Sequence, residues 1–424
     1  MLPTADVFEC HLPLSASVRD DLLEIAGGAW KGLVENAIAS EVYPIDKIVR
    51  NRTTGRCATL RRPRDIVDAT QGMVAHSRTR ATIEQAADFF YLDTPAKAQQ
   101  FARVMDELVE AKRALYPLVD RPVVVTDGHK NCDNIVVPAT ASALDYMSVD
   151  WMMIKFKKGV PARDLCYLEI HKEFKFACPL TGVTRRGWVR CIHSVRMDCC
   201  PDMQKKFGVI RMEIHRSGHV FMESNEAGVL DYYKLYFGSP RGAVLGKHFN
   251  GLYLKGAMRT SARSILNLDE HFTTERLKPL LSAPLDMSLA HAATCGTCRL
   301  AFSWRHPKKL CRACGDPICP KCSSQWSLTL HGSAIKVPLC KRCVGPGLNV
   351  DDADEMYLIE SKDRKQRYST ASDVVSTIRE TYLSIDRSES SSSSFANDIM
   401  HGIDQQKELL HKLQDRLAAI RPAY

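Results

Sequence analysis

Four Cys-x-x-Cys pairs between residues 295 and 343 constrain this chain more than any other feature of its sequence. They contain half of its 16 cysteines, and the intervals between successive pairs are 12, 4 and 17 residues. One such turn directs two thiolates at one ion, and two turns complete the four-sulfur tetrahedron that zinc adopts in closed structural sites. The sequence therefore predicts two structural zinc ions, held by Cys295, Cys298, Cys311, Cys314, Cys319, Cys322, Cys340 and Cys343.

The order of the pairs predicts how they share the two ions. The short interval between the second and third pairs is too tight for both to enclose one zinc, so alternate pairs should share a metal. Cys295, Cys298, Cys319 and Cys322 would form one site, and Cys311, Cys314, Cys340 and Cys343 the other. Sequential pairing is the less favoured alternative. The regular pairing argues against disulfides or a redox dithiol.

The basic charge of the chain is concentrated in the same segment. The formal net charge is +9, and residues 291–347 contain nine Lys or Arg against the single acid Asp316, an excess of eight. The expected partner of this segment is therefore anionic: a lipid headgroup, a nucleic acid or an acidic protein.

The run CGTCRLAFSWRHPKKLCRACGDPICPKCSS carries a family resemblance. Phe302 stands four residues after Cys298, Arg312 follows Cys311, and Gly315 follows Cys314. In these positions and in its cysteine spacing the segment resembles a FYVE zinc finger. The resemblance implies binding to phosphatidylinositol 3-phosphate on endosomal membranes, with Trp304 inserted in the bilayer. The alternative is that Trp304 caps the small zinc core. It implies headgroup contacts from Arg305, Lys308, Lys309, Arg312, Lys341 and Arg342.

Three positions differ from the usual FYVE pattern. No Trp-x-x-Asp precedes Cys295, the basic Arg-Arg-His-His run is replaced by residues 307–310, and Pro338 and Leu339 replace Arg-Val. These changes favour a looser attraction to acidic lipids, to which each basic residue contributes about 1 kcal/mol. Without the paired histidines, membrane binding should depend only weakly on pH between about 6 and 8.

Length and composition place the finger in a larger protein. The 424 residues suggest two or three domains, and 45% hydrophobic residues allow a substantial core. We find neither a signal-peptide pattern at the start nor an apolar run of about 18 residues. We therefore expect a cytoplasmic protein that reaches endosomal or other acidic membranes peripherally.

Before the finger, residues 17–118 read as two helical regions and one hairpin. Apolar spacing over residues 17–38 predicts an amphipathic helix, and a turn at Thr53, Thr54 and Gly55 predicts a hairpin over residues 43–62. A second helical region is predicted for residues 82–118, where Thr82 and the glutamine three residues later form a capping box.

Closely spaced β-rich runs then follow from residue 123 to residue 237. No helical crossover fits between them, so they predict a meandering antiparallel sheet. Residues 242–266 read as a long helix. A curved sheet closed by a C-terminal helix is an α+β, helix-grip architecture.

Short motifs in this region carry a second resemblance. The runs ADFF at 87–90, RDLCYLE at 163–169, GWVRCIHSV at 187–195 and GVIRMEIHRSG at 208–218 resemble the START domain of lipid-binding proteins. The resemblance implies one hydrophobic lipid enclosed between sheet and helix. Arg163, Trp188 and Arg211 are candidates for the cavity wall, although a purely structural role is also open. A START-like domain followed by a FYVE-like finger is similar to an arrangement abundant in oomycetes.

The chain is therefore expected to have four parts. These are a START-like domain at 1–280, a FYVE-like finger at 290–347, an acidic and serine-rich linker at 348–396 with a possible short helix, and a coiled-coil-like helix at 397–421. In the last part, apolar residues from Ile399 to Ile420 alternate by four and three, with Gln406 among them. This pattern favours a homodimer, and packing of the helix against its own chain is the alternative.

No catalytic motif supports an enzyme, because the sequence has no phosphate-binding glycine loop, no Ser-His-Asp signature and no open metal site. The predicted function is a peripheral membrane adaptor or lipid carrier. The alternative is a RING-like ubiquitin ligase or a protein-interaction finger. A nucleic-acid finger is disfavoured, because stacking aromatics are few apart from Trp304 and Trp326.

Overall fold

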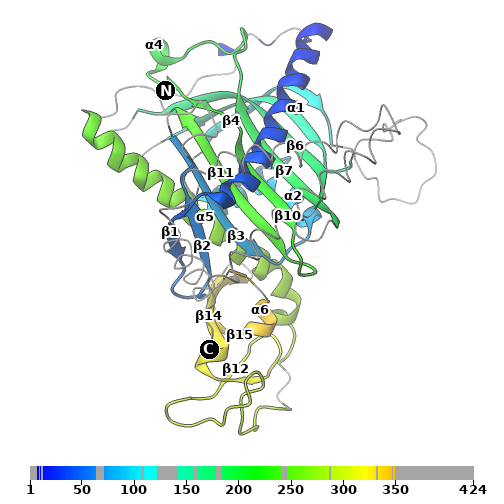
Figure 1. Cartoon of the computed structure of the whole chain (residues 1–424), viewed down its shortest axis with the longest axis vertical. Helices are drawn as coiled ribbons and strands as arrows, with labels where there is room; N and C mark the ends of the chain where they lie inside the picture. The colour runs from blue at the N-terminus through cyan, green and yellow to red at the C-terminus, as the bar shows by residue number, and fades with distance from the viewer. Residues whose placement is uncertain are drawn as a thin grey trace, which may run out of the picture.

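The computed structural model describes most of the chain up to residue 348. The described residues are 7–8, 10, 13–63, 71–106, 109–121, 142–155, 161–177, 183–239, 246–285, 288–330, 333–345 and 347–348. The start of the predicted β-rich region, from residue 123 to residue 141, the linker after residue 348 and the coiled-coil-like helix at 397–421 lie outside these residues. Within them the chain forms a large α+β domain and a small finger at one end of it (Figure 1).

One antiparallel sheet forms the centre of the large domain. Its strand order is β1-β2-β3-β11-β10-β7-β6-β5-β4, and the short strands β8 and β9 pair with β6 and β11. The strands are β1 (Ile45–Arg50), β2 (Cys57–Arg61), β3 (Gln71–Thr79), β4 (Val109–Val119), β5 (Tyr146–Ile154), β6 (Arg163–Ala177), β7 (Thr184–Ser194), β8 (Ile210–Arg211), β9 (Glu213–Ile214), β10 (Ser217–Glu223) and β11 (Leu230–Ser239). Only the β6·β8 pairing is parallel among those described.

Helices cover both faces of this sheet. They are α1 (Ala16–Ala39), α2 (Ile83–Phe90), α3 (Pro95–Met105), α4 (Gln204–Phe207) and α5 (Gly246–Ser282), with a 3-10 turn at Ser40–Val42. The long helix α1 crosses one face, while α2, α3 and α5 lie on the other (Figure 1). None of the helices in the described part of the chain is long and apolar enough to cross a bilayer.

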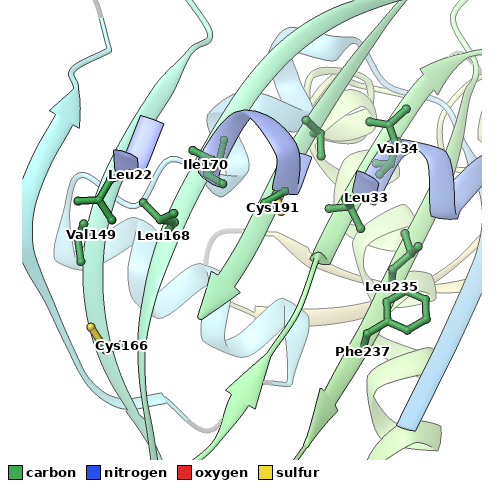
Figure 2. Packing of buried hydrophobic residues seen from close by; sticks show 14 of the residues in the cluster. Leu22, Leu33, Val34, Val149, Cys166, Leu168, Ile170, Cys191, Leu235 and Phe237 are labelled. Atoms are coloured by element: carbon green, nitrogen blue, oxygen red, sulfur yellow. The ribbon is translucent and has the colours of Figure 1, made fainter. Parts of the chain in front are cut away.

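The α1 face of the sheet carries one apolar core. Leu22 of α1 lies beside Leu168 and Ile170 of β6, and Leu33 lies nearer Leu235 of β11, as Figure 2 shows. Alternation along β6 explains this arrangement, because successive side chains of a strand point to opposite faces. Cys166 therefore lies on the same face as Leu168. The predicted helix at 17–38 is confirmed by α1, although Val18 and Ile25, two of its apolar positions, are exposed.

The opposite face holds a second, aromatic core under α2, α3 and α5. Phe90 of α2 stacks on Trp188 of β7 with ring centroids 5.9 Å apart, and Phe221 lies within the same cluster. The predicted hairpin and capping box are both confirmed. Gly55 adopts φ +76° in the turn between β1 and β2, and the Thr82 and Gln85 side chains cap α2 reciprocally.

The predicted helical region over residues 82–118 is confirmed as two helices in its first part and was wrong in its last part, which is a strand. This stretch contains α2, α3 and then the edge strand β4, which pairs with β5. The β4 sequence is rich in Ala, Lys, Arg and Leu, which favour helices locally. Pairing with β5 and burial of Leu115 and Leu118 outweigh that preference, since tertiary packing overrides weak propensities.

The final helix is longer than the sequence indicated. Residues 242–266 were predicted to be helical, whereas α5 extends to Ser282 with Pro279 in its last turns. The added turns reach the finger, where Leu277 and Leu281 enter its core. The α+β sheet with a long C-terminal helix is confirmed, and α5 also connects it to the zinc finger.

Candidate functional site

The finger is built from two short hairpins and single helical turns. Its elements are β12 (Lys309–Leu310), β13 (Pro317–Ile318), a 3-10 turn (Pro320–Cys322), β14 (Ser323–Leu330), β15 (Ser333–Cys340) and α6 (Lys341–Val344). So small a unit has little apolar core of its own, so metal binding must supply much of its folding free energy.

The eight cysteines form the two predicted clusters. In each cluster the four sulfur atoms lie within 4.8 Å of one another, and the members are Cys295, Cys298, Cys319 and Cys322, then Cys311, Cys314, Cys340 and Cys343. The cross-brace is therefore confirmed. Zinc with Zn–S bonds of about 2.3 Å requires sulfurs about 3.8 Å apart in a tetrahedron. The Cys298–Cys319 and Cys314–Cys340 separations are 3.7 and 3.9 Å, so both clusters fit zinc.

Backbone groups support the ligands from outside. The amide of Cys319 donates to the Cys295 sulfur at 3.4 Å, and the amide of Cys340 donates to the Cys311 sulfur at 3.3 Å. Such donors stabilise thiolates and fix their orientation. After the second pair, Gly315 turns the chain at φ +75°, and Arg299 holds the equivalent position after the first pair at φ +63°.

Trp304 protrudes from the finger into solvent. Its side chain is 83% exposed, and the Arg305 guanidinium lies 4.7 Å from the centre of its ring. Phe302, two residues earlier, packs instead against the first cysteine cluster. The aromatic pair thus divides into one core residue and one free ring, which a bilayer interface would accommodate with its N–H in water.

The six predicted headgroup residues have different surroundings. Arg305, Lys308, Lys309, Lys341 and Arg342 are exposed. The Lys308 ammonium donates to the carbonyls of Ala290 and Ala292, and Arg342 pairs with Asp316. Arg312 is only half-exposed, and it donates a hydrogen bond to the carbonyl of Leu281 in α5. The structure therefore directs Arg312 at the large domain.

The end of α5 is built into the second zinc cluster. Leu277 and Leu281 share one buried core with Cys311, Cys340 and Trp326. The Arg276 guanidinium donates to the carbonyls of Cys343 and Val344 at 2.9 and 2.8 Å. Both carbonyls lie at the C-terminal end of α6, where the partial negative charge of the helix end favours a cation.

A second contact joins the finger to the sheet through Arg56, next to β2. Arg56 donates to the Gly345 carbonyl at 2.8 Å, faces the Asp269 carboxylate at 3.4 Å and lies over the Trp326 ring. Gly347 allows this approach, because a Cβ there would lie 1.7 Å from the Arg56 guanidinium. Arg56 and Arg276 are not among the residues predicted from the sequence, since no local pattern distinguishes a buried arginine at a junction.

The three predicted cavity residues do not share one site. Trp188 is fully buried in the aromatic core beneath α2. By the alternation of side chains along β6, Arg163 belongs to the same face of the sheet as Trp188. Arg211 instead binds the Asp164 carboxylate at 3.0 and 2.8 Å on the α1 side of the sheet. The parallel β6·β8 pairing sets this position.

A buried charge network that the sequence analysis missed lies on the Trp188 face. Arg190 of β7 binds Glu169 of β6, and Lys112 of β4 reaches both Glu169 and Asp150. Burial alone would raise the pKa of Glu169, but Arg190 and Lys112 hold it well below its usual range. Strand alternation alone does not reveal the network, because the apolar neighbours Leu168 and Ile170 point to the α1 face, and Glu169 is buried on the opposite face.

Comparison with known families supports the assignment of the finger. Residues 287–347 match the model of the FYVE zinc finger. With the cysteine geometry described above, this segment is a FYVE zinc finger, as its sequence predicted. No curated protein matches the chain.

Comparison with solved structures finds similarity to StAR-related proteins. Human StAR-related lipid transfer protein 5 is similar at 10% identity and a TM-score of 0.38, over 60% of this chain and 99% of that one. Human STARD10 is similar at 12% identity and a TM-score of 0.34, over 57% of this chain and 80% of that one. A STAR-related lipid transfer protein fragment from Xanthomonas axonopodis is similar at 13% identity and a TM-score of 0.31, over 53% of this chain and 97% of that one.

Proposed function

We propose that this protein is a peripheral membrane protein whose finger docks on anionic, phosphoinositide-containing membranes while its large domain holds one hydrophobic lipid. The observation that carries the proposal is the exposed Trp304 beside Arg305 on a zinc-organised FYVE finger. An aromatic ring flanked by cations gains both from burial at the interface and from the negative surface potential. The endosome is the expected location.

The charge that reaches the membrane comes from the exposed basic residues. Arg305, Lys309 and Lys341 are exposed, and the exposed Lys308 and Arg342 add charge although they also bind protein oxygens. Each cation near an anionic leaflet contributes about 1 kcal/mol. Arg312 has a different role, because its hydrogen bond to Leu281 holds α5 to the finger. We therefore expect binding that increases steadily with the charge of the headgroup.

The lipid of the large domain would lie between the sheet and helices α2, α3 and α5. The aromatic core there surrounds Trp188, and the charge network of Glu169 and Arg190 provides a polar end. The hydroxyl of Tyr167 is buried beside this network with no hydrogen-bond partner among the described residues. A buried hydroxyl without a partner is costly, so a polar lipid group is a fitting occupant.

Vesicle cosedimentation of the zinc-loaded full chain tests the docking. Vesicles contain phosphatidylinositol 3-phosphate, another phosphoinositide or phosphatidylserine at equal total charge. We expect sedimentation with all three, and at least a fivefold loss of affinity for Trp304→Ala. Ile25→Ala removes a 43% exposed apolar side chain of α1 and serves as the control. Equal binding by Trp304→Ala and the wild type would contradict insertion of Trp304.

Lipid binding by the large domain needs a separate assay. Organic extraction of the purified chain, followed by mass spectrometry, should yield about one lipid per protein. Uptake of a fluorescent phospholipid or sterol from vesicles should be retained by Trp304→Ala at high vesicle concentration. A chain that neither carries lipid after purification nor takes up either probe would refute this part of the proposal and leave the docking intact.

A further inference from the structure

A cysteine cluster outside the finger lies on the α1 side of the sheet. Cys166 of β6 and the adjacent Cys199 and Cys200, in the segment between β7 and α4, are all buried there. Cys166 and Cys200 line the wall of one cavity. The segment is held against β6 by the Val195 amide, which donates to the Cys166 carbonyl at 3.0 Å. Neither zinc cluster involves these residues.

An immobilised cation lies beside one sulfur of this pair. The Arg211 guanidinium is 3.5 Å from the Cys200 sulfur and also donates to the Pro201 carbonyl at 2.9 Å. Its two bonds to Asp164 fix its position, and the Trp151 indole holds the same carboxylate at 2.9 Å. Arg211 therefore cannot move away from Cys200 without breaking several contacts.

The two sulfurs differ in acidity. The hydrogen bond from Cys166 and the charge of Arg211 lower the pKa of Cys200, although burial opposes them. The same hydrogen bond and burial raise the pKa of Cys166. A low-pKa thiol beside a second, protonated thiol is the arrangement that redox-sensitive cysteines use.

A cavity makes the pair accessible. Its volume is about 560 Å³, and its wall includes Cys166, Cys200, Arg196, Arg211, Asp202 and His215. The Arg196 side chain is 88% exposed, so the cavity opens to solvent. Both cysteines belong to the wall of this cavity, so a small molecule that enters it can approach them although each cysteine is itself buried.

We propose that Cys200 and Cys166 form a peroxide-sensitive dithiol, with Cys200 as the reacting thiolate and Cys166 as the resolving thiol. The Cys200 sulfur attacks one oxygen of hydrogen peroxide, the O–O bond breaks, and the departing hydroxide takes up a proton to form water. Cys200 is then a sulfenic acid. The Cys166 sulfur attacks it, the S–O bond breaks, and a second water leaves as the disulfide forms. Two thiols and one peroxide thus give one disulfide and two waters.

The disulfide would covalently tie β6 to the segment that leads into α4. Figure 1 places α4 at the opposite end of the large domain from the finger. Oxidation would therefore act on the large domain without touching the zinc ligands. This separation provides the main readout, because peroxide that attacks the zinc thiolates releases zinc, whereas the proposed reaction does not.

The experiment treats the zinc-loaded full chain with hydrogen peroxide at one to ten equivalents, alkylates the free thiols and maps disulfides by peptide mass spectrometry. A zinc-sensitive dye follows metal release. We expect the Cys166–Cys200 disulfide to form before zinc is released and to be reversed by dithiothreitol. Release of zinc before this disulfide forms, or a disulfide that maps to Cys199, would overturn the proposal.

Variants separate the two roles. Cys166→Ser should leave a sulfenic acid at Cys200 that dimedone traps, and Cys200→Ser should abolish oxidation at both positions. Arg211→Gln should slow alkylation of Cys200 by about tenfold at neutral pH, the effect of one pKa unit on the thiolate fraction. Cys191→Ser, at a buried thiol of the same core, is the control and should change nothing. Wild-type rates in Cys200→Ser would also overturn the proposal.

Discussion

The Arg312 guanidinium of the zinc finger donates a hydrogen bond to the backbone carbonyl of Leu281 at 2.8 Å, one residue before α5 ends. Leu281 itself is buried in the finger core. The basic residue that follows the third cysteine therefore serves the junction between finger and sheet domain. The helix that covers the sheet and the module proposed to dock on membranes form one continuous structure.

This contact predicts opposite phenotypes for two neighbouring basic residues. Arg312→Ala should lower the free energy of unfolding by about 2 kcal/mol, because it removes a charged hydrogen-bond donor from a half-buried contact. Vesicle affinity of the folded variant should not change. Lys309→Ala should leave stability unchanged and weaken vesicle binding about fivefold. Urea unfolding and cosedimentation measure both, and a larger loss of vesicle binding in Arg312→Ala would contradict the assignment.

Loss of each zinc site should affect α5 differently. Cys340 shares a buried core with Leu277 and Leu281, whereas Cys298 belongs to the cluster that packs against Phe302. Cys340→Ser should therefore increase hydrogen exchange in the last two turns of α5, and Cys298→Ser should leave those amides protected. Zinc content, measured in parallel, should fall by one ion in each variant. Equal protection of α5 in both variants would show that the second site does not support the helix.

Glu270 predicts a loss of stability around neutral pH. Burial, together with the adjacent Asp269, raises the pKa of Glu270 to about 7. The folded state thus retains a proton that the unfolded state releases near its lower, ordinary pKa. The stabilisation is complete below that ordinary value and is lost as the pH rises through about 7.

Glu270→Gln removes this titration. Relative to the wild type, the variant should gain about 1 kcal/mol between pH 5 and pH 8, a figure reduced for the partial exposure of the side chain. Urea midpoints at four pH values provide the measurement. Glu275→Gln alters a carboxylate of the same helix that pairs with Lys278, and it is the control. Parallel pH profiles for wild type and Glu270→Gln would refute the prediction.

Gly218 should not tolerate a side chain. Its φ of +144° is unfavourable for other residues, and a Cβ would lie 1.9 Å from the Arg190 carbonyl. Gly218→Ala should cost about 3 kcal/mol or more and disturb the Arg190–Glu169 pair. Gly228→Ala, at φ +73° with open space around the Cβ position, should cost only about 1 kcal/mol. Thermal unfolding of both variants tests this difference. A similar loss of unfolding free energy in the two variants would contradict the prediction.

Local chemistry made the zinc sites predictable from sequence. A Cys-x-x-Cys turn brings its two sulfurs together within four residues, and the short interval between Cys314 and Cys319 favours the alternate pairing, which the structure confirms over the sequential one. The capping box of Thr82 and Gln85 and the helix α1 are local in the same sense. In each case the interacting groups are near neighbours in the chain, so their spacing alone fixes the geometry.

Only the tertiary structure decided the positions that depend on distant partners. Residues 109–119 became a strand because β5 pairs with them, and α5 continued to Ser282 because the finger buries Leu277 and Leu281. Arg211 and Trp188 lie on opposite faces of the sheet, because the pairing of β8 with β6 places Arg211 on the α1 side. The physical reason is common to all three. Strand pairing and helix packing gain their free energy from contacts between segments far apart in sequence, and a local pattern does not encode which segments will meet.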